Sequence, residues 1–120
     1  MQKIHRLIRN VCAVFIPLLF SVCFADLGDR SNLTIRTIHP MSVERLHCPE
    51  CSGITRIYVN PGAWGATECR EDAADIYAND EHMLSIVMAA WAMGKQIRFE
   101  VNDQHPTFNG VCRATALFVS

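Results

Sequence analysis

The chain has 120 residues, of which half are hydrophobic, 11 are Lys or Arg, 12 are Asp or Glu and six are Cys. A chain of this length is expected to form one domain. It has no stripe of Lys and Arg, which excludes the electrostatic footprint of a protein that binds nucleic acid through its phosphates.

The first 25 residues have the pattern of a bacterial-type secretion signal. Lys3, Arg6 and Arg9 form a basic start, an apolar run follows over residues 11–24, and Ala25 offers a small residue to signal peptidase. The apolar run is shorter than the roughly 20 residues of a transmembrane helix. We therefore expect cleavage after Ala25, and a secreted or periplasmic mature domain, residues 26–120, without a membrane span. Cleavage leaves eight basic and twelve acidic residues, because the leader holds three of the 11 bases and none of the 12 acids.

The mature segment has the pattern of a mainly β domain. Residues 26–32 are polar and predict a loose lead-in. Alternating apolar residues over 33–46, interrupted by Pro40, predict a bent strand or two short ones, which form a hairpin with a strand over 54–59. Residues 73–78 suit a short third strand. The alternation is clearest over 96–103, and the last strand is expected over 111–119.

One helix is expected between the third strand and the strand at 96–103. Asn79 and Asp80 are suitable N-cap residues, the segment from Met83 to Met93 is helical in character, and Gly94 is a typical residue after a helix end.

This helix lacks the polar face of an ordinary surface helix. Between its first and last methionines only Ser85 is polar. Either the helix plugs a curled sheet, or a neighbouring subunit covers its second face. Under the second explanation Met88, Trp91 and Ala92 are the candidate subunit-interface residues.

The order of these features resembles a known family. The features are Cys69, the Ile76-Tyr77 strand, Met83-Leu84-Ser85, the run from Ala89 to Lys95, Ile97-Arg98-Phe99 and Cys112 before a last apolar strand. Over residues 54–119 this order resembles small exported bacterial proteins related to the B subunit of subtilase cytotoxin. The resemblance implies a small, five-stranded, partly open barrel of the oligosaccharide/oligonucleotide-binding (OB) type, with the helix between strands 3 and 4. It also implies a ring-shaped homo-oligomer that binds cell-surface glycans and carries a separate catalytic A subunit.

Four cysteines remain after cleavage, and an even number in a small exported domain predicts disulfides. We expect Cys69 to pair with Cys112 and Cys48 with Cys51, and crossed pairings stay open. A redox pair and half of a zinc site are the alternatives for Cys48-x-x-Cys51. Neither has its usual setting, because a strand rather than a helix follows, and no second C-x-x-C is present.

Trp64 is the candidate ligand-binding residue. It follows Pro61-Gly62 and is expected on an exposed loop, where it can stack on a sugar; alternatively it folds over one end of the barrel. The acidic stretch from Glu68 to Glu81 is expected to be a solvated loop.

The sequence shows no nucleophile–base arrangement, no metal-ligand pattern and no phosphate loop, so we expect neither an enzyme nor a cofactor. The functional hypothesis is an exported binding module that resembles toxin B subunits, binds a cell-surface glycan as a homo-oligomer and delivers a separate A subunit. The alternative is a periplasmic or secreted structural or interaction protein without a sugar site.

Overall fold

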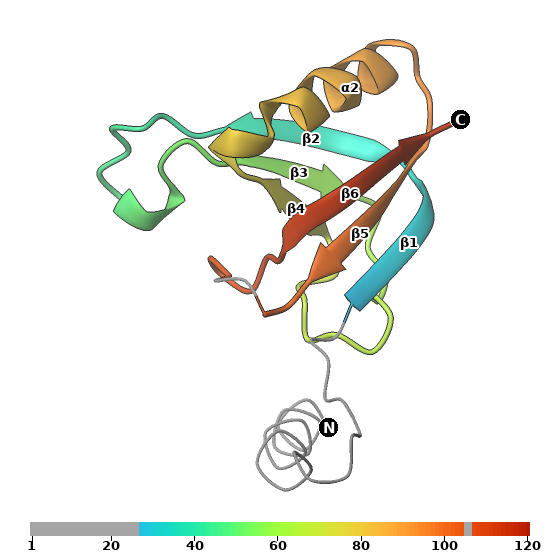
Figure 1. The fold of residues 1–120 in the computed structure, drawn as a ribbon, viewed down its shortest axis with the longest axis horizontal. Helices are drawn as coiled ribbons and strands as arrows, with labels where there is room; N and C mark the ends of the chain where they lie inside the picture. The colour runs from blue at the N-terminus through green and yellow to red at the C-terminus, as the bar shows by residue number, and fades with distance from the viewer. Residues whose placement is uncertain (1–26, 105–106) are drawn as a thin grey trace, which may run out of the picture.

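The computed structural model in Figure 1 describes residues 27–104 and 107–120. The predicted leader, residues 1–25, lies outside the described residues. The elements, in chain order, are β1 (Leu27–Leu33), β2 (Ile35–Pro40), η1 (Pro49–Cys51), β3 (Thr55–Val59), β4 (Ala73–Ile76), η2 (Ala78–Asp80), α2 (Glu81–Ala92), β5 (Ile97–Asn102) and β6 (Arg113–Val119). No helix within these described residues is long and apolar enough to span a bilayer.

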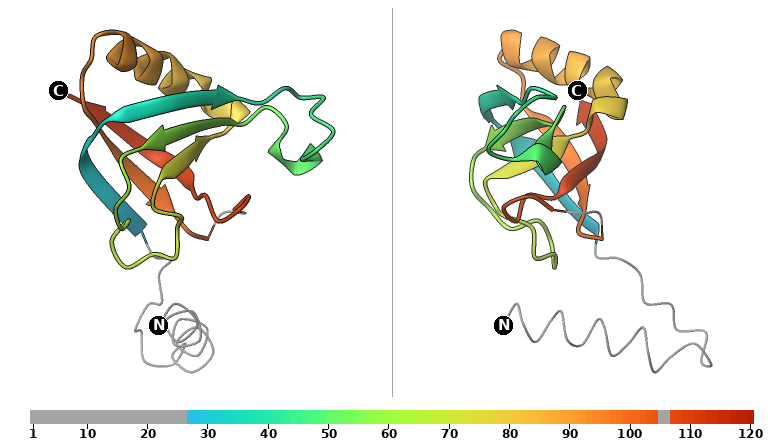
Figure 2. Two further views of the ribbon diagram at one scale, coloured as in Figure 1. Left: turned by 180° about the vertical axis from the view of Figure 1, so that it is seen from behind. Right: turned by 90° about the vertical axis from the view of Figure 1, so that its left-hand side faces the viewer.

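The six strands form one sheet in the order β1-β5-β6-β4-β3-β2. Neighbouring strands are antiparallel except β4 and β6, which run parallel where Asp75 lies opposite Arg113. β1 and β2 occupy the two ends of this order, although only Thr34 separates them in the chain. The sheet is therefore strongly curled, as Figure 2 shows.

The predicted loose lead-in is wrong over residues 27–32, because they belong to β1. Only Gly28 and Leu33 of this strand are buried, so the segment has little of the apolar alternation that would reveal a strand. Backbone pairing with β5 holds it in place instead, from Leu27 opposite Asn102 to Leu33 opposite Ile97. The sheet consequently has six strands where five were predicted.

The other predicted strands are confirmed, except that the first one ends at Pro40, so residues 41–46 belong to a loop and not to a bent or second strand. β5 alternates as expected, with Ile97, Phe99 and Val101 buried and the residues between them half-buried. Its buried side chains meet those of β3 inside the curl, where Ile57 and Val59 are fully buried. The predicted hairpin is formed by β2 and β3.

A loop of residues 41–54 joins β2 to β3 and projects from the body of the sheet (Figures 1 and 2). It carries η1 and a small apolar cluster of Met41, Cys51 and Ile54, against which Tyr77 and Phe108 pack from outside the loop. This cluster is separate from the main core.

The predicted helix is confirmed as α2, but it follows the fourth strand and precedes the fifth, where a place between strands 3 and 4 was predicted. It ends in a hydrogen-bonded C-terminal turn, in which the Gly94 amide donates to the Trp91 carbonyl and the Lys95 amide to the Ala90 carbonyl. Gly94 has φ +66°, the left-handed conformation that this turn requires.

The start of α2 differs from the prediction. Asp80 occupies the N-cap position, but its side chain accepts no hydrogen bond from the helix backbone. Its carboxylate accepts one from Nη2 of Arg113 at 2.7 Å instead. This ion pair ties the start of α2 to β6.

Candidate functional site

The outer face of α2 exposes the apolar residues that the sequence singled out. The helix lies across one end of the curled sheet, and it buries only Met83, Val87 and Ala90 (Figures 1 and 2). These three residues belong to the main core, so one side of the helix closes an end of the curled sheet while its outer side stays exposed. Met88 and Trp91 are each 51% exposed.

Further exposed apolar residues surround these two. We call the exposed apolar surface of this helix the α2 face; its residues are Ile86, Met88, Ala89, Trp91, Ala92 and Met93. The three candidate interface residues therefore all lie on it, and no charged side chain interrupts the segment from Met83 to Met93.

An open hollow of about 680 Å³ lies beside the end of α2. It is formed by β1, the start of β5 and the end of β6, and its lining residues are Ser31, Asn32, Lys95, Gln96, Ile97, Arg98, Phe118, Val119 and Ser120. The lining combines hydroxyl, amide and cationic groups with one aromatic ring. We call it the polar hollow.

Two ordered contacts fix the arginine of the polar hollow. The guanidinium of Arg98 lies 4.4 Å from the centroid of the Phe118 ring. Its Nε donates a hydrogen bond to a carboxylate oxygen of Asp29 at 2.8 Å. Hydrogen bonding to Arg98 lowers the pKa of Asp29 from its ordinary value of 3.8. Phe118 and Arg98 thus form one side of the polar hollow, and the exposed Lys95 is also part of its lining.

Trp64 is not on an exposed loop, and this expectation is corrected. Its side chain is 1% exposed, and its indole Nε1 donates to the Arg70 carbonyl at 2.9 Å. Gly28 makes this packing possible, because a Cβ at that position would lie 2.6 Å from the Trp64 carbonyl oxygen. A ring buried in this way has no face open to a sugar. The alternative, that it folds into the core at one end of the sheet, agrees with the structure.

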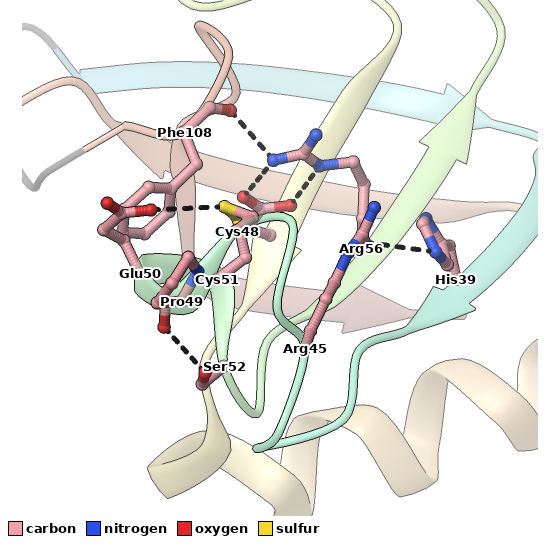
Figure 3. The surroundings of a disulfide bond; sticks show 10 residues. His39, Arg45, Cys48, Pro49, Glu50, Cys51, Ser52, Arg56 and Phe108 are labelled. Atoms are coloured by element: carbon pink, nitrogen blue, oxygen red, sulfur yellow. Dashed lines mark hydrogen bonds and ion pairs between the residues drawn. A yellow bond between two sulfur atoms is a disulfide. The ribbon is translucent and has the colours of Figure 1, made fainter.

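Among residues 27–104 and 107–120 the disulfides are Cys69–Cys112 and Cys48–Cys51, the predicted pairing. Cys69 and Cys112 are both buried, and their bond joins the segment before β4 to the start of β6. Cys48–Cys51 lies on the projecting loop, with Cys48 half-buried and Cys51 buried (Figure 3). Disulfides of this kind are compatible with an extracellular or periplasmic protein.

The acidic stretch is not one solvated loop. Asp75 is fully buried in β4, and its two carboxylate oxygens accept hydrogen bonds from Arg56 on β3 at 2.8 and 2.9 Å. Burial raises the pKa of Asp75, and the two hydrogen bonds from Arg56 oppose that rise. Arg56 also donates to the carbonyl of Phe108, which anchors the loop before β6 (Figure 3).

Within residues 27–104 and 107–120, no three His, Cys, Asp or Glu side chains gather so that they could hold a metal ion. Comparison with protein-family models, curated proteins and solved structures found no match. No family is identified.

Sequence reasoning found the α2 face but missed the polar hollow. Its residues come from three segments that are distant in the sequence, and the strand that supplies Asn32 was itself not predicted. The one signal in the sequence was an aromatic residue near the end of the last strand, Phe118. In the structure its side chain is 44% exposed.

Proposed function

We propose that the chain is an exported binding module that self-assembles through the α2 face and binds a glycan in the polar hollow. The observation that carries the proposal is the exposed, uncharged apolar surface of α2. An apolar surface of this kind on a small domain is typical of a protein–protein contact.

The occupant proposed for the α2 face is a second copy of this chain. The two ends of the exposed helix carry opposite charges, Glu81 at its start and Lys95 just after its end, and both residues are exposed. An antiparallel helix from a second copy would bring Lys95 of one copy to Glu81 of the other. Ala89 and Ala92 between them are small enough for the two helices to approach closely.

The strand order supports the proposed OB-type barrel. β1 and β2 can be counted as one strand bent at Thr34, since no other residue separates them. The sheet then has five strands, and α2 lies between the third and the fourth. A five-stranded barrel with one helix is the architecture that the resemblance to toxin B subunits implies.

The lining of the polar hollow supports a glycan as ligand. Sugars present many hydroxyl groups and a few apolar C–H faces, so their sites combine amide, hydroxyl and charged groups with an aromatic ring. Asn32, Gln96 and Lys95 supply the polar groups, and Phe118 supplies the ring. The volume of about 680 Å³ lies in the range of ligand sites.

The assembly is tested by light scattering of the exported protein after size-exclusion chromatography. We expect a homo-oligomer, and monomers for Met88→Glu and Trp91→Glu, because each places a charge in the contact. Leu46→Glu is the matched control: Leu46 is 90% exposed on the 41–54 loop, so this variant should assemble like the unmodified protein. A monomeric unmodified protein would rule out the assembly.

Glycan binding is tested on a glycan array with the assembled protein. We expect glycan binding, and we expect Phe118→Ala and Gln96→Ala each to weaken it at least tenfold. His47→Ala is the control and should leave binding unchanged, because His47 is exposed on the 41–54 loop. If a ligand is found, co-purification with exported proteins then tests for a catalytic A subunit.

A second candidate function is an exported interaction protein without a sugar site. The burial of Trp64 favours it, because that ring was the candidate sugar-stacking residue. If the fully assembled protein bound no glycan on the array, that result would support this second function over the first.

A further inference from the structure

We propose that Cys48–Cys51 is a thiol–disulfide exchange site, opened by attack of an external thiolate on Sγ of Cys48, whereas Cys69–Cys112 is a permanent structural bond. The proposal is independent of the glycan site and of assembly, because it rests on the 41–54 loop alone.

The two disulfides differ in their accessibility. Cys48 is half-buried on the projecting loop, while Cys51 is 2% exposed and belongs to the small cluster with Met41 and Ile54. A thiolate must approach along the axis of the S–S bond to displace the second sulfur, so solvent access selects Cys48 as the attacked atom. In Cys69–Cys112 neither residue is accessible.

The turn that holds the two cysteines together does not depend on the disulfide. The Cys51 amide donates to the Cys48 carbonyl at 3.0 Å, and the Ile54 amide donates to the Cys51 carbonyl at 3.0 Å. The Ser52 hydroxyl donates to the Pro49 carbonyl at 2.6 Å (Figure 3). None of these hydrogen bonds involves a sulfur atom, so we expect them to hold the two thiols close enough to form the disulfide again after reduction.

The base of the loop is also held independently of the disulfide. The Met41 amide donates to the Ile54 carbonyl at 2.9 Å, and the Gly53 amide donates to the Met41 carbonyl at 3.2 Å. The loop cluster is separate from the main core. Opening Cys48–Cys51 is therefore expected to leave the sheet intact.

The atoms and electrons of the exchange reaction balance with external thiols as the only co-reactant. An incoming thiolate attacks Sγ of Cys48, the Cys48–Cys51 bond breaks, and Sγ of Cys51 leaves as a thiolate that takes a proton from water. A second external thiolate attacks the mixed disulfide at the sulfur of the first external thiol and releases Cys48 as a thiolate. Two external thiols are oxidised to one disulfide, and this chain gains two electrons and two protons.

Two exposed apolar residues on the same loop point to cysteine thiols of a polypeptide as the partner. Val43 is 74% and Leu46 is 90% exposed, and both precede Cys48 by only a few residues. Exposed apolar side chains on the same loop as the reactive sulfur can hold the flanks of an extended polypeptide, which a small thiol does not have.

Glu50 provides an electrostatic test of where the attack occurs. Its Oε2 lies 3.6 Å from Sγ of Cys48. The carboxylate repels an approaching thiolate, so Glu50→Gln should speed exchange at low salt, and the difference should shrink as ionic strength rises. A rate that Glu50→Gln leaves unchanged at low salt would contradict attack at Cys48.

The main experiment titrates the oxidised, exported protein with graded ratios of reduced and oxidised glutathione. Free thiols are then blocked and the blocked cysteines identified by peptide mass. We expect Cys48 and Cys51 to be reduced together while Cys69 and Cys112 stay oxidised and the fluorescence of buried Trp64 keeps its native emission. The proposal fails if Cys48–Cys51 resists until Cys69–Cys112 also opens, or until the protein unfolds.

Single-cysteine variants identify the attacked sulfur. In Cys51→Ser, glutathione disulfide should form a stable mixed disulfide at Cys48. In Cys48→Ser, the reaction at Cys51 should be at least tenfold slower, because Cys51 is buried. Equal rates in two variants with native circular dichroism would overturn the assignment.

The source of the thiol is tested with a second probe, a cysteine peptide with apolar residues on both sides. We expect it to react faster than glutathione, and Leu46→Ser to remove that advantage without changing the glutathione rate. Equal rates for both probes would overturn the polypeptide partner.

Discussion

Arg56 and Asp75 form a charged pair in a place where the sequence indicated a solvated acid. The pair joins β3 to β4, and Arg56 also holds the Phe108 carbonyl. Buried charges are tolerated when every partner is present, and they destabilise the fold when one is removed.

We therefore expect Arg56→Met to lower the free energy of unfolding by about 3–5 kcal/mol, because it leaves the Asp75 carboxylate buried without its partner. The double change Arg56→Met with Asp75→Leu should be less destabilising than the single one. Urea denaturation measures both. A double variant that is as unstable as the sum of the two single variants would show that the pair is not coupled.

Asp29 gives the domain an acid-sensitive contact between β1 and β5. Arg98 lowers the pKa of Asp29 below 3.8, so the folded chain binds this proton less readily than the unfolded chain. The stability from the pair is therefore fully present above about pH 4 and is lost as the pH falls through the lowered pKa.

We expect Asp29→Asn to be less stable than the unmodified protein at pH 7 in low salt, and the two urea midpoints to converge as the pH falls through the lowered pKa of Asp29. The pair is exposed, so added salt should reduce the difference. Glu44→Gln, a change to an exposed acid of the 41–54 loop, serves as the control. A constant difference at all pH values would assign the effect of Asp29→Asn to packing.

At the scale of single elements, α2 is bound to the sheet by a narrow stripe. Val87 is fully buried at the centre of that stripe, whereas Ile86, its neighbour in the chain, is 49% exposed. The two positions therefore separate the contribution of the buried stripe from that of the α2 face.

Val87→Ala should cost about 2 kcal/mol of unfolding free energy, from the loss of buried apolar area and the cavity it leaves. Ile86→Ala should cost less than about 1 kcal/mol in the monomer. Thermal and urea unfolding of a dissociated sample measure both. An equal loss of unfolding free energy in Val87→Ala and Ile86→Ala would mean that other residues of the same chain cover the α2 face.

The sequence was sufficient to predict the elements whose burial is periodic. β5 alternates in burial, and α2 has a clear end at Gly94, so both were predicted to within a few residues. β1 was missed because pairing with β5, a partner distant in the chain, fixes it rather than its own pattern. Asp80 occupies the predicted N-cap position, but its side chain does not cap the helix, because Arg113, which is distant in the chain, binds its carboxylate.

The same limit applies to the candidate site. The α2 face was predictable because it lies within one helix. The polar hollow and the buried position of Trp64 depend on how β1, β5 and the loop before β4 meet. Local sequence patterns carry no information about contacts between segments that are distant in the chain.

At the scale of the whole molecule, the two disulfides are expected to contribute unequally to stability. Cys69–Cys112 closes a loop with a sequence separation of 43, while Cys48–Cys51 spans only 3. In the chain-entropy account the first stabilises the fold by about 4 kcal/mol and the second by about 2 kcal/mol.

Replacing Cys69 and Cys112 together by Ser should therefore lower the unfolding free energy more than replacing Cys48 and Cys51. Denaturation of the two double variants under non-reducing conditions checks the order. Equal losses would show that the 41–54 loop contributes to the stability of the whole sheet.

The position of β1 has a consequence for the order of folding. Leu27 is paired with Asn102, so the first strand of the sheet finds its partner only when most of the chain is available. Contacts of such long range are slow to form, because the intervening chain must be ordered or looped first. A chain that crosses a membrane with its N-terminus leading would expose this strand long before β5 arrives. We expect a holding chaperone to raise the folded yield during that interval.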